Sequence, residues 1–282
     1  EKTAAALQKH IPVYVIKRPV LPDSFLCVYG EFGLRREIYR LLPDFFDLHC
    51  GLTTGACATA AAKAALYKIL YGEEIPSMEI QLPSGEPVVL PVASVEADET
   101  GVACSVIKEA GDDPDVTNGC RIKVHVSVVE GETEEEPLIR FQAGPGVGTV
   151  TLPGLGLEVG GPAINQIPRR MMETELHRLV VASGRKISSI WVTVSVEHGE
   201  ELAKRTFNPK LGIVGGISII GTSGIVRPFS SEAFVASIRK EVQVAKAVGC
   251  SQLVINSGAK SERYLKTYLA DRSIPQQGFV HY

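Results

Sequence analysis

Three carboxylates lie within four residues of one another, at Asp112, Asp113 and Asp115. Carboxylates at this spacing can bind a cation, accept hydrogen bonds from a ligand or act as a general base. The segment lacks the glycine and the terminal glutamate of an EF-hand calcium loop. Aspartate also stabilises turns through its own side chain, so a solvated turn without a ligand is an equally good interpretation.

Thr53, Thr54 and Gly55 precede an alanine-rich stretch that ends at Gly72. Alanine favours helix, threonine can cap a helix start and glycine often follows a helix end, which together predict a helix over 56–71. The first N–H groups of a helix lack intrahelical partners and attract anions. Two hydroxyls and small residues would let an anionic ligand approach. From the local pattern alone, a well-capped buried helix is the better interpretation.

Arg169 and Arg170 follow Asn165 near the start of a second predicted helix, over about 168–181, with Gly184 beyond its end. Guanidinium groups bind carboxylates in a bidentate manner. A cation at a helix start is unfavourable unless an anion joins it, so the pair indicates an anionic ligand. Exposed surface arginines are the commoner alternative.

The strongest local signal is the segment 208–224, where strand-like apolar residues carry five glycines and end in a Gly-Thr-Ser-Gly turn. Glycine in a strand marks close approach by a ligand or by backbone, and the turn offers hydrogen-bond donors. The segment matches neither the dinucleotide fingerprint nor the P-loop. We therefore predict ligand binding here. The candidate contacts are Asn208, Gly215, Gly216, Gly221, Thr222, Ser223 and Gly224.

The composition excludes several classes of protein. Hydrophobic residues make up 45%, charged residues 22%, and the net charge is −3, which is typical of a soluble globular protein and predicts no nucleic-acid partner. The apolar stretches are too short and too rich in glycine to span a bilayer. Six cysteines and six histidines form no pair with metal-ligand spacing, so we predict no metal site. Reduced thiols in the cytoplasm are the simplest interpretation.

Three parts of the chain must position these segments. The few elements predicted in residues 1–46 can bury only a small hydrophobic core. We interpret this segment as the tail of a preceding domain, a linker or a docking arm. Strands at 78–82, 87–92, 102–107 and 122–129 join the two helices in a mixed α+β domain over 47–185. A strand at 188–196 and alternating elements at 231–248, 252–256 and 261–270 predict a smaller, Rossmann-like α/β domain over 186–282. We expect that domain to be incomplete at the C-terminus of this chain.

Five blocks of this sequence, in order, resemble the cobalt-precorrin-5B C1-methyltransferase family, CbiD. They are 51–65 (GLTTGACATAAAKAA), 108–117 (KEAGDDPDVT), 144–151 (GPGVGTVT), 162–165 (PAIN) and 206–226 (TFNPKLGIVGGISIIGTSGIV). Two departures from the family pattern are expected: Gln166 stands where we expect a proline, and the chain ends before the family's usual C-terminus, which would leave part of the cofactor domain missing.

The resemblance implies that S-adenosylmethionine (SAM) methylates C1 of cobalt-precorrin-5B and gives cobalt-precorrin-6A, in anaerobic cobalamin biosynthesis. Cobalt then enters only as part of the substrate. The acidic groups around the macrocycle would meet Thr53, Thr54, Gly55, Asn165, Arg169 and Arg170, whereas SAM would bind the 208–224 segment. Methyl transfer from a sulfonium needs mainly positioning, and Asp112, Asp113 or Asp115 could remove a proton from the macrocycle.

The first residues resemble a different protein. Residues 11–19 (IPVYVIKRP) are similar to the tail of a precorrin-6A reductase, which implies a fusion of consecutive pathway steps and neighbouring cobalamin-pathway enzymes as partners. Two other functions stay open from the residues alone. One is a small-molecule kinase-like enzyme that binds phosphate, although no P-loop lysine is present, and the other is a non-enzymatic tetrapyrrole-binding protein. Binding of SAM would discriminate between these and the methyltransferase.

Overall fold

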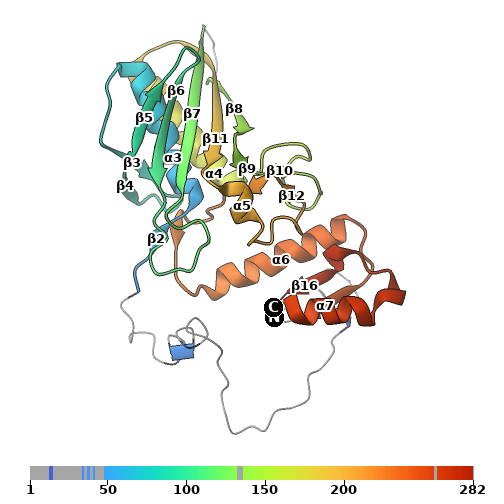
Figure 1. The fold of residues 1–282 in the computed structure, drawn as a ribbon. Helices are drawn as coiled ribbons and strands as arrows, with labels where there is room; N and C mark the ends of the chain where they lie inside the picture. The colour runs from blue at the N-terminus through green and yellow to red at the C-terminus, as the bar shows by residue number, and fades with distance from the viewer. Residues whose placement is uncertain are drawn as a thin grey trace. The chain divides into compact units, whose positions relative to one another are not determined.

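The computed structural model in Figure 1 describes residues 48–131, 136–256 and 259–281, together with 13–14, 34, 37–38 and 41. The chain divides into two units. One is Cys50–Val226, and the other combines Arg227–Tyr282 with Glu1–His49. Among the described residues, no helix is both long enough and apolar enough to cross a membrane.

Helix α3 (Thr54–Tyr71) lies at the centre of the first unit. Its small alanine side chains let it pack closely, and from Thr54 to Leu66 every residue except Lys63 is buried. Thr53 caps the helix by accepting a hydrogen bond from the Ala56 amide, and Gly72 ends it in a left-handed conformation (φ 75°). The predicted helix and both of its boundary residues are therefore confirmed.

A five-stranded sheet packs on α3 and α4 (Gln166–Ser183), which both lie on one of its faces (Figure 1). Neighbouring strands are antiparallel except the last pair, β11 and β8, which are parallel. Alternate residues of β7, such as Ile122, Val124 and Val126, are fully buried against the helices, as their spacing predicts. In order across the sheet, the strands are β5 (Ser94–Ala97), β6 (Val102–Ile107), β7 (Arg121–Glu130), β11 (Ile187–Val196) and β8 (Leu138–Ala143).

Short strand pairs tie distant segments of this unit together. A hairpin joins β3 (Ser77–Gln81) to β4 (Pro87–Pro91), with the predicted turn between them. The other pairs are β2 (Gly51–Leu52) with β14 (Ile225–Val226), β9 (Gly146–Val147) with β13 (Gly216–Ile217), and β10 (Thr149–Val150) with β12 (Ile213–Val214). Helix α5 (Gly199–Ala203) follows β11. These pairs bring the predicted motifs to one end of the unit.

The second unit contains a parallel sheet of three strands in the order β1 (Val13–Tyr14), β15 (Leu253–Asn256) and β16 (Phe279–His281). Helix α6 (Ser231–Ala247) begins at Ser230, whose side chain accepts from the Ala233 amide. Helix α7 (Ala259–Tyr268) and the short 3₁₀ turns Ala270–Arg272 and Gln276–Gly278 connect β15 to β16. Within the segment 1–46, β1 pairs with the central strand β15.

The structure corrects the domain boundary predicted between residues 185 and 186. Strand β11 lies between β7 and β8 in the five-stranded sheet, so residues 187–196 belong with the unit Cys50–Val226. Its buried residues Ile190, Val192 and Val194 share one hydrophobic core with α3. Alternating hydrophobicity identifies a strand but does not name its partner, which is why the sequence pattern placed β11 in the following domain.

Candidate functional site

The starts of α3 and α4 approach each other at Gly55. A Cβ atom on Gly55 would lie 2.7 Å from Pro168 Cγ and 3.0 Å from the carbonyl oxygen of Ile220. The Gly55 amide donates to that same carbonyl at 2.9 Å. Glycine at this position therefore allows two helix starts and the segment at Ile220 to meet.

Thr54 holds the Ile220 backbone with its side chain. Its hydroxyl donates to the Ile220 carbonyl at 3.1 Å and accepts from the Ile220 amide at 3.0 Å. Thr53 acts on the same turn, because its amide donates to the carbonyl of Gly224 at 3.0 Å. A Cβ on Gly221 would collide with the Thr53 side chain. The hydroxyls predicted to bind substrate are therefore engaged within the protein, where they shape the turn 220–224.

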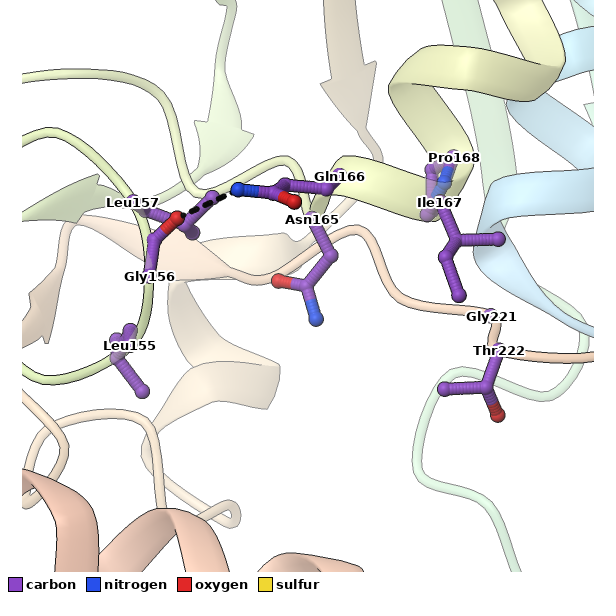
Figure 2. Close-up of a pocket in the computed structure, with 9 residues that line it drawn as sticks. All are labelled: Leu155, Gly156, Leu157, Asn165, Gln166, Ile167, Pro168, Gly221 and Thr222. Carbon is purple, nitrogen blue, oxygen red and sulfur yellow. Dashed lines mark hydrogen bonds between the residues drawn. The ribbon is translucent and has the colours of Figure 1, made fainter.

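A pocket of about 250 Å³ lies where these segments meet (Figure 2). Asn165, Gly221 and Thr222 were predicted as ligand contacts from separate parts of the sequence, and all three line it. The other lining residues were not predicted from the sequence; they are Leu155, Gly156, Leu157, Gln166, Ile167 and Pro168. The glycine-rich run that continues from Gly144 to Gly161 was the available signal for the loop 155–157.

Asn165 and Gln166 carry the amide groups of this pocket. Asn165 is the N-cap residue of α4, yet its side chain makes no capping hydrogen bond. In Figure 2 its amide extends into the space between the loop 155–157 and Ile167. Gln166 Nε2 donates to the carbonyl of Gly156 at 3.2 Å and so links the start of α4 to that loop.

Packing explains much of the glycine content that had indicated a ligand. Gly216 of β13 lies opposite Gly146 of β9, and a Cβ on Gly216 would collide with the Gly146 backbone. Gly215 differs, because it adopts a left-handed conformation (φ 84°) and a Cβ there would meet nothing within 4 Å. Gly216 therefore has a structural reason within the protein, as a close approach of two strands.

Two other residues of the segment 208–224 that were predicted to contact the ligand form hydrogen bonds within the protein instead. The Asn208 side chain is buried, donates from Nδ2 to the Gly216 carbonyl at 3.4 Å, and accepts from the Ser218 hydroxyl at 3.3 Å. The Ser223 hydroxyl donates to the carbonyl of Ile225 at 3.0 Å and accepts from its amide at 3.3 Å. Thr222, in contrast, is exposed at the pocket.

Strand β2 brings the aspartate loop to the same end of the unit. Its Leu52 amide donates to the carbonyl of Glu109 at 2.7 Å, and Cys50 forms a bridge with Gly111. On its other side β2 pairs with β14, which follows the turn 220–224. Asp112 is exposed and Asp113 is half-buried on this loop.

The Asp115 side chain forms an ion pair and also stabilises a turn through hydrogen bonds. It lies 2.9 Å from Nζ of the fully buried Lys108, and it accepts from the amide and the hydroxyl of Thr117 at 2.7 and 2.6 Å. Burial opposes its charge, but the bonds from Thr117 and the cation of Lys108 outweigh burial and lower the pKa of Asp115. A carboxylate held in this way is a weak proton acceptor, so its geometry favours a structural role.

The arginine pair divides into two different environments. Arg169 Nε donates to the carbonyl of Ile164 at 2.8 Å and its guanidinium also reaches the carbonyl of Pro162 at 3.2 Å. Burial lowers the pKa of Arg169, which stacks over Phe141 at 5.3 Å. Arg170 is exposed. Arg170 is therefore the more exposed cation of the pair, whereas Arg169 is half-buried. The described residues hold no group of three or more His, Cys, Asp or Glu side chains that could bind a metal ion.

The chain is similar to proteins of one family. The CbiD family model matches residues 43–228. The cobalt-precorrin-5B C(1)-methyltransferase of Prosthecochloris aestuarii is 46% identical over 236 residues, which cover 84% of this chain and 63% of that protein. The protein of the same name from Burkholderia cenocepacia is 45% identical over 233 residues, covering 82% and 63%. The chain thus spans about 63% of the length of these relatives.

A solved structure is also similar. It is the crystal structure of a cobalamin biosynthesis protein (cbiD) from Archaeoglobus fulgidus. The sequences are 27% identical, the match covers 79% of this chain and 68% of that one, and the TM-score is 0.49.

Proposed function

Because the chain belongs to the CbiD family, we propose that it transfers the methyl group of SAM to C1 of cobalt-precorrin-5B. The observation that carries this proposal is the meeting of three family-like segments at one pocket. The start of α3, the start of α4 and the turn 220–224 are far apart in sequence, yet they are joined through Gly55, Thr54 and Ile220.

The reaction needs positioning more than a reactive side chain. The methyl carbon leaves the sulfonium, whose sulfur keeps the bonding electron pair, and bonds to C1 through an electron pair from the π system of the macrocycle, which then loses one proton to a base or to water. S-Adenosylhomocysteine is the other product. An enzyme accelerates such an in-line displacement by holding donor and acceptor in contact and excluding water. A rigid junction of two helix starts and a short turn suits that task.

The residues divide accordingly. We assign Asn165, Gly221 and Thr222 to ligand contact, and Thr53, Thr54 and Gly55 to holding the pocket in shape. The exposed guanidinium of Arg170 can bind a carboxylate of the macrocycle. If a general base is used, Asp112 and Asp113 are better candidates than Asp115, whose charge is held by Lys108 and Thr117.

Finer assignments of the domains follow as proposals. The parallel order of β1, β15 and β16 supports a Rossmann-like relationship for the second unit. We propose that the chain acts in the cytoplasm beside other cobalamin-pathway enzymes. The similarity of residues 11–19 to a precorrin-6A reductase further supports a fused polypeptide, in which NAD(P)H-dependent reduction would be measurable.

The deciding experiment incubates the chain with cobalt-precorrin-5B and SAM labelled in its methyl group. We expect the label in a corrinoid that is heavier by one methylene group, with an equal amount of S-adenosylhomocysteine. Calorimetric titration with SAM, and separately with ATP and Mg²⁺, tests the alternatives. Saturable ATP binding without SAM binding would replace the proposal with the kinase-like function. Corrinoid binding without SAM binding would indicate a carrier.

A further inference from the structure

The pocket at the start of α4 has aliphatic walls. Leu155 and Leu157 lie on one side, and Ile167 and Pro168 lie on the other (Figure 2). Apolar walls on two sides suit a planar ring between them, because the ring can bury both of its faces against aliphatic carbon. The loop that supplies the first wall is tied to α4 by the bond from Gln166 to Gly156.

None of the nine lining residues is charged. A carboxylate or an ammonium group placed here would lose water without gaining a charged partner, which is unfavourable. A carboxylate here would meet only the N–H groups at the start of α4 and no charged side chain, so the lining favours an uncharged group over the acidic fringe of the macrocycle or the amino-acid end of SAM. The nucleoside is the part of the methyl donor that carries no charge.

The Asn165 amide supplies the polar edge of the pocket. It makes no capping bond to α4 and extends into the space between the walls. A carboxamide presents a donor and an acceptor in one plane, which is the pattern that asparagine uses to bind the N6 and N7 edge of adenine. Thr222 adds a hydroxyl at the exposed side.

We infer that this pocket binds the adenine ring of the methyl donor, with Asn165 reading the edge of the base. The inference rests on the proposed function. The pocket has a volume of about 250 Å³, which is below the roughly 300–1,000 Å³ that encloses a drug-sized ligand. The pocket therefore fits one small ring system and not a tetrapyrrole. The sulfonium end would then extend from the pocket toward the corrinoid.

Adenosine alone is the probe, titrated calorimetrically into the whole chain beside S-adenosylhomocysteine and methionine. Asn165→Asp keeps the shape of the side chain at the N-cap position of α4, but it removes the amide donor and adds a charge. We expect it to raise the Kd of adenosine and of S-adenosylhomocysteine about tenfold or more. Gln142→Glu on β8 makes the same chemical change outside the pocket, and we expect no change in either Kd. Leu157→Ala tests the wall independently and should weaken both ligands severalfold.

The outcomes separate this inference from the proposed function. If S-adenosylhomocysteine binds equally well to the parent chain, Asn165→Asp and Leu157→Ala, the base lies elsewhere and the inference is wrong while the methyltransferase proposal stands. If adenosine binds through Asn165 but no methyl group reaches cobalt-precorrin-5B from SAM, the pocket is a nucleoside site and the proposed reaction is wrong. If neither adenosine nor S-adenosylhomocysteine binds to the parent chain, both are overturned.

Discussion

The hydroxyl of Thr54 makes two hydrogen bonds to the backbone of one residue, Ile220, which lies 166 positions later in the chain. It donates to the carbonyl at 3.1 Å and accepts from the amide at 3.0 Å. The same carbonyl accepts from the amide of Gly55 at 2.9 Å. This contact joins the first turn of α3 to the turn that lines the pocket, so the geometry of the candidate site depends on it.

Replacing Thr54 by valine should destabilise the protein and weaken ligand binding together. The change preserves the shape of the side chain but removes both hydrogen bonds to Ile220, and we expect the free energy of unfolding to fall by about 1–3 kcal/mol. Urea unfolding measures this loss. Thr149→Val is the matched control, because Thr149 is exposed on β10 and its substitution should change the free energy by less than about 0.5 kcal/mol. Equal stability of the two variants would contradict the role assigned to Thr54.

Two adjacent glycines should respond differently to alanine. In Gly216→Ala the added methyl group collides with the backbone of Gly146, so β9 and β13 must separate, and we expect a loss of more than about 3 kcal/mol. In Gly215→Ala the methyl group meets open space, and only the left-handed conformation costs free energy, about 1–2 kcal/mol. Thermal and urea unfolding compare the two. A larger loss at Gly215 would show that packing between strands does not explain Gly216.

The ion pair of Asp115 and Lys108 should make stability depend on pH. The pKa of Asp115 is lowered in the folded protein, so its stabilisation is present above the pKa of an unfolded aspartate and is lost as pH falls through the folded value. We expect Asp115→Asn to lower the free energy of unfolding by about 2–3 kcal/mol near neutral pH. The difference from the parent should shrink below about pH 4. A difference that stays constant down to acidic pH would contradict the assignment.

Cysteine labelling tests how tightly α3 is enclosed. Burial raises the pKa of the Cys57 thiol to about 12, against the opposing effect of Lys108, whereas Cys50 is exposed. Iodoacetamide at mildly alkaline pH should therefore modify Cys50 in the folded protein and leave Cys57 untouched until urea unfolds it. Peptide mass mapping distinguishes the two sites. Rapid modification of Cys57 without denaturant would mean that the start of α3 opens in solution.

Alanine at Arg169 should lower the stability of the protein, whereas alanine at Arg170 should weaken substrate binding. Arg169→Ala removes donors from the carbonyls of Ile164 and Pro162, and we expect a loss of about 1–3 kcal/mol in the free energy of unfolding. Arg170→Ala should change stability by less than about 0.5 kcal/mol, because its side chain is exposed. It should instead raise the Kd for cobalt-precorrin-5B, most clearly at low salt. Unchanged binding in Arg170→Ala would remove this residue from the site.

Local features of the sequence predicted most helices and strands. Threonine and glycine at its two ends marked α3, and the alternating residues of β7 marked a half-buried strand. Short pairs such as β2 with β14 were beyond this kind of prediction, because two residues in a strand leave no periodic pattern. The partner of β11 was missed for a related reason, since periodicity carries no information on which strand lies alongside.

Residue types and their order were enough to predict the family resemblance, the main helices and strands, and several of the segments that meet at the pocket. Asn165, Gly221 and Thr222 were selected from residue type and position alone. The use of each polar group became known only from the folded structure, because a hydroxyl, an amide or a carboxylate can form hydrogen bonds either with a ligand or with the protein's own backbone. The bonds of Thr54, Asn208, Asp115 and Arg169 go to the protein. The Asn165 amide extends into the pocket instead, and Thr222 lines its exposed side, so distances across the folded chain are what separate the two groups.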